Sequence, residues 1–275
     1  MKIKNKLFDN KIIKQFGSIL AIIELISSFI FIFADIPEHC KIFAGIIFSI
    51  FLIITYIIIW ITSNMYKHVK LNINNSKVEI KYGNIFEQEG KKVITFNEYF
   101  DTYVDDNIIN KKSINGQFII NKVNNISEFD DYIFNELNAR NKKFETNNKR
   151  PVGKKNKFKL GTTIKYQDEF LLTAFTRFNS NNNAEISMRE YINFLVELWN
   201  ELDILYSQDI VVIPLLGAGV TRFKNYNVTE QELLELILWT FKISKIKFTY
   251  PSKLCIIIHD SLKDKINLYK IKEEY

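Results

Sequence analysis

Two long apolar runs near the start of the chain constrain its fold more than any other feature. Residues 16–33 and 42–61 contain 18 and 20 residues and hold a single charged side chain, Glu24. Because a helix rises about 1.5 Å per residue, each run can cross roughly 30 Å of hydrocarbon. The connector 34–41 is too short for anything but a tight hairpin. We therefore predict two transmembrane helices, which excludes a purely soluble protein.

The distribution of lysines predicts the orientation of this hairpin. Five lysines and one aspartate lie in residues 1–15, and Lys67 and Lys70 follow the second run. The positive-inside rule places both termini in the cytoplasm, which predicts a multi-pass protein of the inner (plasma) membrane. A cleaved signal peptide is the alternative for the first run, but no small-residue cleavage site follows it. We expect a basic cytoplasmic N-terminus (1–15), a juxtamembrane linker (62–77) and a cytoplasmic domain (78–275).

Glu24 is a costly residue for a membrane helix. It lies eight positions into the first apolar run, about 12 Å deep at helical rise, where an ionised carboxylate is unfavourable by a few kcal/mol. Glu24 is therefore a candidate for lining a helix bundle or pore that several chains form together. Alternatively, it hydrogen-bonds Ser27 or Ser28 within its own helix.

The remainder of the chain has the alternating pattern of a three-layer α/β/α domain with a mixed central sheet. Helices are predicted after Ser127, after Ser187 with Glu190, and after Thr229 with Glu232, and a short one from Ser261. Two strands are apolar on both faces, as buried central strands are. The predicted strands are Val78–Tyr82, Lys92–Phe96, Phe158–Tyr166, Phe170–Phe175, Ile210–Pro214 and Leu254–Ile258.

Charge and cysteine content narrow the possible partners. Beyond residue 61 the chain has 31 basic and 27 acidic residues, a balance that argues against a dedicated nucleic-acid binder. Cys40, Cys255 and three scattered histidines suggest neither a disulfide framework nor a metal site. The segment 138–159 is predicted to be a long exposed loop with nine basic residues and one acidic residue. It either contacts the anionic inner leaflet or is simply solvated.

The clearest ligand-binding pattern is Gly217-Ala218-Gly219-Val220-Thr221-Arg222, directly after a predicted buried strand. In open α/β sheets, ligands bind in the crevice at the carboxyl ends of strands. Small residues there let backbone N–H groups approach phosphate oxygens, and an arginine adds charged donors. Taken alone, such a glycine pattern is weak evidence for phosphate binding.

Together with other segments, this loop resembles the macro domain, the ADP-ribose-binding module. The segments are Gly83-Asn84-Ile85-Phe86, NEYFDT from residue 97, SINGQF from residue 113 and PLLGAGVTRF from residue 214. With the two-helix anchor in front, the whole chain resembles the membrane-anchored macro effectors of type II Thoeris antiphage systems.

The resemblance implies roles for residues at matching positions. Asn84 stands where the family usually has an adenine-contacting Asp, and Ile85 would present backbone atoms to the adenine. Asn97 corresponds to the Asn near the distal ribose, and Gly217–Thr221 to the loop that wraps the pyrophosphate. The implied ligand-binding residues are Asn84, Ile85, Asn97, Asp101, Ser113, Gly116, Gln117, Gly217, Ala218, Gly219, Val220, Thr221 and Arg222.

The chain also departs from the macro pattern. Asn84 has no charge, and only Gly116 remains where the family has several consecutive glycines. The residues also have local explanations: Asn97 can cap a loop, Gly116 can form a turn, and Asp101 can bond to nearby backbone.

The resemblance implies an effector without a cofactor or metal. An ADP-ribose conjugate of histidine or imidazole type, made from NAD by a partner TIR-domain enzyme, would bind the domain and drive homo-oligomerisation. Membrane damage and arrest or death of the infected cell would follow. The alternatives are a membrane-tethered reader or hydrolase of ADP-ribose, with Asp101 as the carboxylate to test, and a structural anchor that no longer binds nucleotide.

Overall fold

The computed structural model describes residues 3–179, 183–224 and 226–275, and contacts divide the chain into two compact units. One, the helical unit, comprises the chain up to Val69 together with Asn267–Tyr275. The other, the sheet unit, comprises Lys70–Ile266. The expected domain 78–275 therefore needs correction at its end. Its last nine residues pack with the N-terminal helices, because Tyr269 is buried in an apolar cluster with Ile12 and Ile59.

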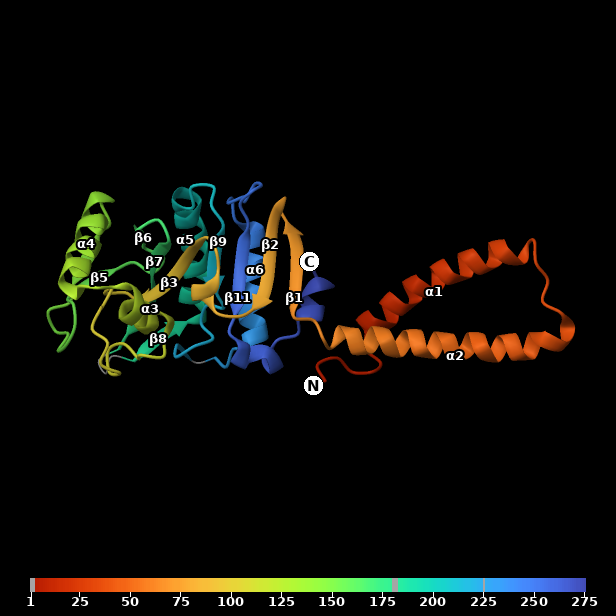
Figure 1. Ribbon diagram of the computed structural model, residues 1–275. Helices are drawn as coiled ribbons and strands as arrows, with labels where there is room; N and C mark the ends of the chain where they lie inside the picture. The colour runs from red at the N-terminus through yellow and green to blue at the C-terminus, as the bar shows by residue number, and fades with distance from the viewer. Residues whose placement is uncertain (1–2, 180–182, 225) are drawn as a thin grey trace. The chain divides into compact units, whose positions relative to one another are not determined.

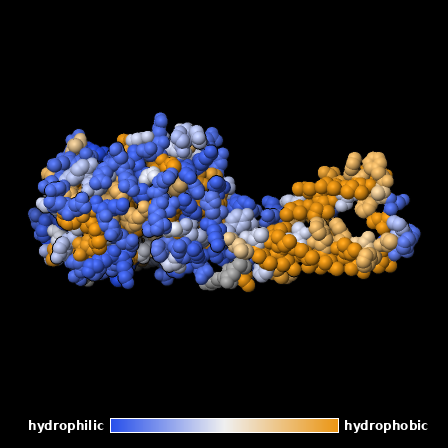
Figure 2. Space-filling view, in the orientation of Figure 1, coloured by the Kyte–Doolittle hydropathy of each residue, from blue (hydrophilic) through white to orange (hydrophobic). Residues whose placement is uncertain are grey.

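The helical unit contains α1 (Asn10–Phe31) and α2 (Glu38–Ser63), drawn in red and orange in Figure 1. By length and composition, both are long and apolar enough to cross a membrane. The first starts earlier than the apolar run because Asp9 caps it, accepting a hydrogen bond from the Lys11 N–H at 2.8 Å. Apolar side chains are exposed along both helices, and Figure 2 shows them as a nearly continuous hydrophobic surface.

Glu24 is exposed on α1. Among the described residues it forms no hydrogen bond with Ser27 or Ser28. The local explanation for this carboxylate is therefore not supported, and a role in contacts with other chains stays a prediction.

The sheet unit is built around a mixed sheet with the strand order β1-β2-β11-β9-β3-β7-β8-β10, in which β6 pairs with β7. The strands β2, β11, β9, β3 and β7 run parallel, while β6 and β8 run antiparallel to β7. Parallel strands bring their carboxyl ends to one edge of the sheet. The strand bounds are β1 His68–Ile73, β2 Ser76–Tyr82, β3 Lys91–Asn97, β4 Phe144–Thr146, β5 Asn156–Phe158, β6 Thr163–Tyr166, β7 Phe170–Phe178, β8 Ala184–Ser187, β9 Val211–Pro214, β10 Arg222–Lys224 and β11 Leu254–Ile258.

Helices cover both faces of this sheet, which confirms the three-layer α/β/α architecture (Figure 1). On one face, Phe96 of β3 packs with Phe118 of α3 and Phe129 of α4. On the other face, Phe175 of β7 contacts Phe194 of α5, with ring centroids 4.6 Å apart, and α5 packs against α6. The bounds are η1 Ile85–Glu87, α3 Ile114–Lys122, α4 Ile126–Ala139, α5 Met188–Leu205, α6 Glu230–Ile243, η2 Asp260–Lys265 and α7 Leu268–Lys272.

Local capping signals were partly right. The boxes at Ser187 with Glu190 and at Thr229 with Glu232 are confirmed. The prediction for Ser127 is wrong, because Asn125 caps α4 by accepting from the N–H groups of Ser127 and Glu128. No helix starts at Ser261 either. The 3-10 helix η2 begins one residue earlier and is capped by His259.

Three segments differ from the prediction. The predicted strand 158–166 is divided into β5 and β6, and Gly161 between them adopts a φ of +92°, which a continuous strand does not allow. The expected loop 138–159 contains the antiparallel pair β4 and β5. The expected linker 62–77 contains β1, whose alternating burial is typical of a sheet edge.

Candidate functional site

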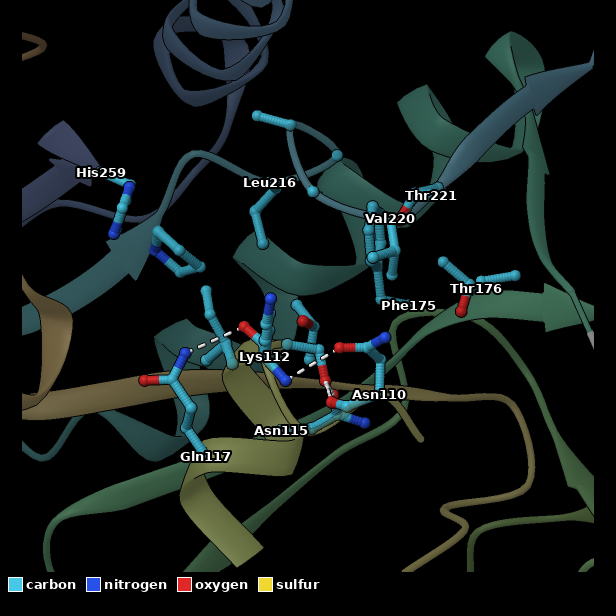
Figure 3. A pocket seen from close by; sticks show the side chains of 18 of the residues that line it. Asn110, Lys112, Asn115, Gln117, Phe175, Thr176, Leu216, Val220, Thr221 and His259 are labelled. Atoms are coloured by element: carbon cyan, nitrogen blue, oxygen red, sulfur yellow. Dashed lines mark hydrogen bonds between the residues drawn. The ribbon is translucent and has the colours of Figure 1, made fainter. Parts of the chain in front are cut away.

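A cavity of about 730 Å³ opens at the carboxyl ends of the five parallel strands. Each strand contributes the residues at its end, namely Gly83 after β2, Asn97 of β3, Thr176 of β7, Leu215 after β9 and His259 after β11. Its size is typical of small-molecule sites, and its position is where ligands bind open α/β sheets. Figure 3 shows Asn110, Lys112 and Gln117 on one side of the cavity and Leu216, Val220 and Thr221 on another.

The loop after β9, which we call the 217–222 loop and predicted to bind a ligand, lines this cavity along its whole length. Its first turn is held in place, because Tyr191 donates to the Leu216 carbonyl at 2.9 Å and Gly217 adopts a φ of +88°. Beyond that turn, the N–H groups of Gly219 and Val220 donate to no acceptor in the described chain. Exposed, unpaired backbone donors are what a phosphate group requires.

The residues that follow Asn110 form a second wall at the start of α3. Ser113 caps this helix, accepting from the Gly116 N–H at 3.2 Å, and Gln117 donates to the Lys112 carbonyl at 2.9 Å. Ser113 and Gln117, both predicted to bind a ligand, line the cavity. Gly116 does not. A Cβ at this position would lie 2.2 Å from the Asn110 carbonyl oxygen, so Gly116 permits close backbone packing behind the wall.

Asn84 and Ile85 line the end of the cavity next to β2. The Asn84 side chain is already used locally, because it caps η1 by accepting from the Phe86 N–H at 3.0 Å and donates to Glu87 at 3.2 Å. Its amide therefore has limited capacity left for a ligand.

Asn97 and Asp101 use most of their polar atoms in hydrogen bonds within the protein. Asn97 lines the cavity, but it donates to Asp101 at 2.8 Å and accepts from the Tyr99 and Asp101 N–H groups. Asp101 lies outside the lining and is only 2% exposed, with Arg150 bound to both carboxylate oxygens at 3.1 and 2.6 Å. The predicted ligand role of Asp101 is thus corrected to a structural one, since its oxygens are occupied.

Most basic residues between positions 138 and 159 are paired within the sheet unit. Arg150 is buried against Asp101, and Lys154, Lys157 and Lys159 lie within 4.0 Å of acidic side chains. The expectation of an exposed basic loop is wrong for the buried Arg150 but holds for Lys159, whose side chain is exposed although it pairs with Glu197.

The charged groups at the cavity favour an anionic ligand. Arg222 and Lys112 are exposed at its rim. The acidic groups at the rim are already compensated: Asp106 pairs with Lys111 at 3.3 Å, and Asp260 pairs with Lys263 at 2.8 Å. Hydrogen bonding from the Lys111 N–H also lowers the pKa of the Asp106 carboxyl.

Several lining residues were not predicted. Thr176 and Phe178 belong to the far part of β7, and Asn110 and Lys112 lie in a segment with no strong pattern. His259 had a usable signal, because it directly follows a strand that was predicted correctly. The residue that follows any buried parallel strand is a candidate for a ligand site, and His259 is such a residue.

Comparison with known proteins places these features in a family. The model of the family described as "Thoeris protein ThsA, Macro domain" matches residues 78–259. The Thoeris protein ThsA of Bacillus amyloliquefaciens (strain Y2) is 39% identical over 260 residues, covering 93% of this chain and 86% of that protein.

Two solved structures show more distant similarity. A mutant of the Oceanobacillus iheyensis macrodomain with ADPR is 15% identical, covering 76% of this chain and 97% of that one, with a TM-score of 0.46. The same macrodomain with ADP is also 15% identical, covering 76% and 95% respectively, with a TM-score of 0.46.

Proposed function

The chain belongs to the family of the Thoeris protein ThsA macro domain, and on this premise we propose that it is an antiphage effector gated by an ADP-ribose-derived signal. One observation carries the proposal. The 217–222 loop presents unpaired N–H groups to a cavity of ligand size at the carboxyl ends of the parallel strands. A pyrophosphate bound there would accept from these donors and lie near Arg222.

The proposed signal is an ADP-ribose conjugate of histidine or imidazole type, made from NAD by a partner TIR-domain enzyme. A cavity of about 730 Å³ accommodates a ligand larger than a simple nucleotide. Binding rather than hydrolysis is favoured, because the carboxylate considered as catalytic, Asp101, is buried against Arg150.

We further propose that α1 and α2 cross the inner membrane with both termini cytoplasmic. Two helices are too few to enclose a water path, so permeabilisation requires several chains, and Glu24 on the exposed surface of α1 would contribute to that assembly. A ligand drives such assembly only if it binds the assembled state more tightly than the resting one. Arrest or death of the infected cell would follow.

The test is calorimetry of the full-length protein in nanodiscs with ADP-ribose, its histidine conjugate and AMP. We expect the conjugate to bind most tightly. Absence of binding to all three would overturn the proposed ligand class. Liposome leakage with the tightest ligand then tests the membrane effect, and Glu24→Leu tests the carboxylate.

A further inference from the structure

The C-terminal part of the chain contributes residues to both the sheet unit and the helical unit. Residues 259–262 line the cavity, and only four residues later the chain passes from the sheet unit to the helical unit, between Ile266 and Asn267. A short stretch of covalent chain therefore separates the ligand cavity from residues that pack on α1 and α2.

His259 fixes the beginning of this stretch. Its Nδ1 lies 3.3 Å from the Ser261 backbone nitrogen and 2.8 Å from the Ser261 Oγ. Because a backbone N–H can only donate, Nδ1 accepts the hydrogen bond from the Ser261 N–H. The same side chain thus lines the cavity and caps η2.

The middle of the stretch is firmly held within the sheet unit. Lys265 pairs with Glu230 of α6 at 2.5 Å. Ile266 is fully buried, and its carbonyl accepts from the Tyr82 hydroxyl at 3.3 Å. The end of η2 is thus fixed to the sheet unit up to Ile266, and the next residue, Asn267, already belongs to the helical unit.

The end of the stretch, α7, packs against the first turns of α1 and the last turns of α2. Asn267 donates to Asn5 at 2.5 Å, Tyr269 donates to Gln15 at 3.0 Å, and Lys11 donates to the Lys270 carbonyl at 3.2 Å. The Tyr269 ring is 2% exposed in the cluster that contains Ile12 and Ile59. Gln15 and Ile12 belong to α1 and Ile59 to α2, so α7 contacts both helices.

We propose that residues 259–272 form a coupling segment, through which ligand contact at His259 changes the hold of α7 on α1 and α2. This inference rests on the proposed function for its biological meaning. The part that can be tested without a ligand is that loss of the η2 cap weakens the contacts of α7 with α1 and α2. Such a link requires an element that both sites influence, and the coupling segment is that element.

Hydrogen exchange of the full-length protein in nanodiscs, measured without ligand, tests the link. His259→Ala removes the cap of η2, and we expect exchange in α7 and in residues 10–15 to become about fivefold faster. His259→Asn should restore near-wild-type exchange, because asparagine is a good cap. Ser113→Ala is the matched control: it removes a helix cap at the same cavity, but on α3, and should leave α7 unchanged.

Equal acceleration by His259→Ala and Ser113→Ala, or no acceleration by His259→Ala, would overturn the coupling segment. Neither result depends on the identity of the signal. If ADP-ribose and its conjugates fail to bind in calorimetry while His259→Ala still loosens α7, the proposed ligand is wrong and the coupling stands.

Discussion

Two turns at the same edge of the sheet differ in how they use their polar groups. The 217–222 loop follows β9 and leaves the N–H groups of Gly219 and Val220 unpaired in the described chain. The turn Asn97–Asp101 follows the neighbouring strand β3, and its side chains satisfy one another and bind Arg150. The first turn therefore keeps backbone donors available at the cavity, whereas the polar groups of the second turn are used in contacts within the protein.

This difference shows why residue type alone is a poor guide to function at a strand end. A buried carboxylate paired with arginine contributes to structure, and breaking the pair is costly. An exposed backbone donor contributes little to folding, but it becomes valuable when an anion arrives. Mutations in the two turns should accordingly separate stability from affinity.

The largest expected effect is on stability. Asp101→Ala leaves the Arg150 guanidinium, only 5% exposed, without its carboxylate, so unfolding should become easier by about 3–5 kcal/mol. Thermal unfolding of the detergent-solubilised protein measures this. The double variant Asp101→Ala with Arg150→Met removes both charges and should recover much of the loss. An Asp101→Ala protein as stable as the wild type would contradict the structural role.

The next effect should fall on affinity alone. A Cβ at Gly219 would meet nothing within 4 Å, so Gly219→Val should change unfolding by less than about 0.5 kcal/mol. Its side chain would obstruct the approach of a phosphate to the loop, and we expect binding of ADP-ribose to weaken at least about thirtyfold, or roughly 2 kcal/mol.

Gly217→Val is the matched control for that variant. Gly217 has a φ of +88° and its Cβ would lie 3.1 Å from the Phe223 ring, so valine there should destabilise the fold by about 1–3 kcal/mol. Equal binding by wild type and a folded Gly219→Val protein would move the site away from the 217–222 loop.

A smaller effect concerns acid stability next to the Asn97 turn. Arg177 pairs with Glu98 at 2.8 Å and also contacts Glu190. Burial opposes ionisation of Glu190, but the Ser187 N–H and Arg177 outweigh it and lower the pKa of Glu190 from 4.5 to about 2. This lowered pKa stabilises the fold fully above pH 4.5, and the stabilisation is lost as the pH falls towards 2.

We expect wild type to lose about 1–2 kcal/mol relative to Glu190→Gln between pH 5 and pH 2, measured by denaturant titration. The comparison with Glu190→Gln is needed because burial raises the pKa of Glu98, which shifts stability with the opposite sign. Parallel pH curves for the two proteins would disprove the assignment to Glu190.

The smallest effect is expected at the rim. Arg222 is exposed, so Arg222→Ala should weaken binding of a diphosphate ligand by about threefold to tenfold at low salt and less at high salt. Arg222→Lys should retain most of the affinity because it keeps the charge. Identical affinities of Arg222→Ala and wild type at low salt would exclude an electrostatic contribution.

The sequence predicted those features that depend on neighbouring residues. The two capping boxes and the doubly apolar strands β9 and β11 are local patterns, and all were found where expected. The 217–222 loop was identified for the same reason, since a strand and its following turn are adjacent in the chain. The start of α4 was predicted wrongly because two neighbouring residues, Asn125 and Ser127, are both good helix caps.

Contacts between distant residues could not be predicted in this way. Asp101 and Arg150 are 49 positions apart, and nothing near either residue specifies the other. The same holds for Tyr269 and Gln15, which are 254 positions apart. Pairing of the short strands β8 and β10 also depends on folding of the whole sheet.

Because Tyr269 is buried between α1 and α2, the helical unit cannot be completed until the end of the chain has been made. Translation produces both helices first, and their base lacks a central aromatic side chain until more than 200 further residues have been made. The sheet unit is completed equally late, because β11, which pairs with both β2 and β9, ends at Ile258, shortly before α7 begins at Leu268. A chain interrupted before residue 269 would therefore carry both membrane-type helices without the aromatic side chain that packs between them.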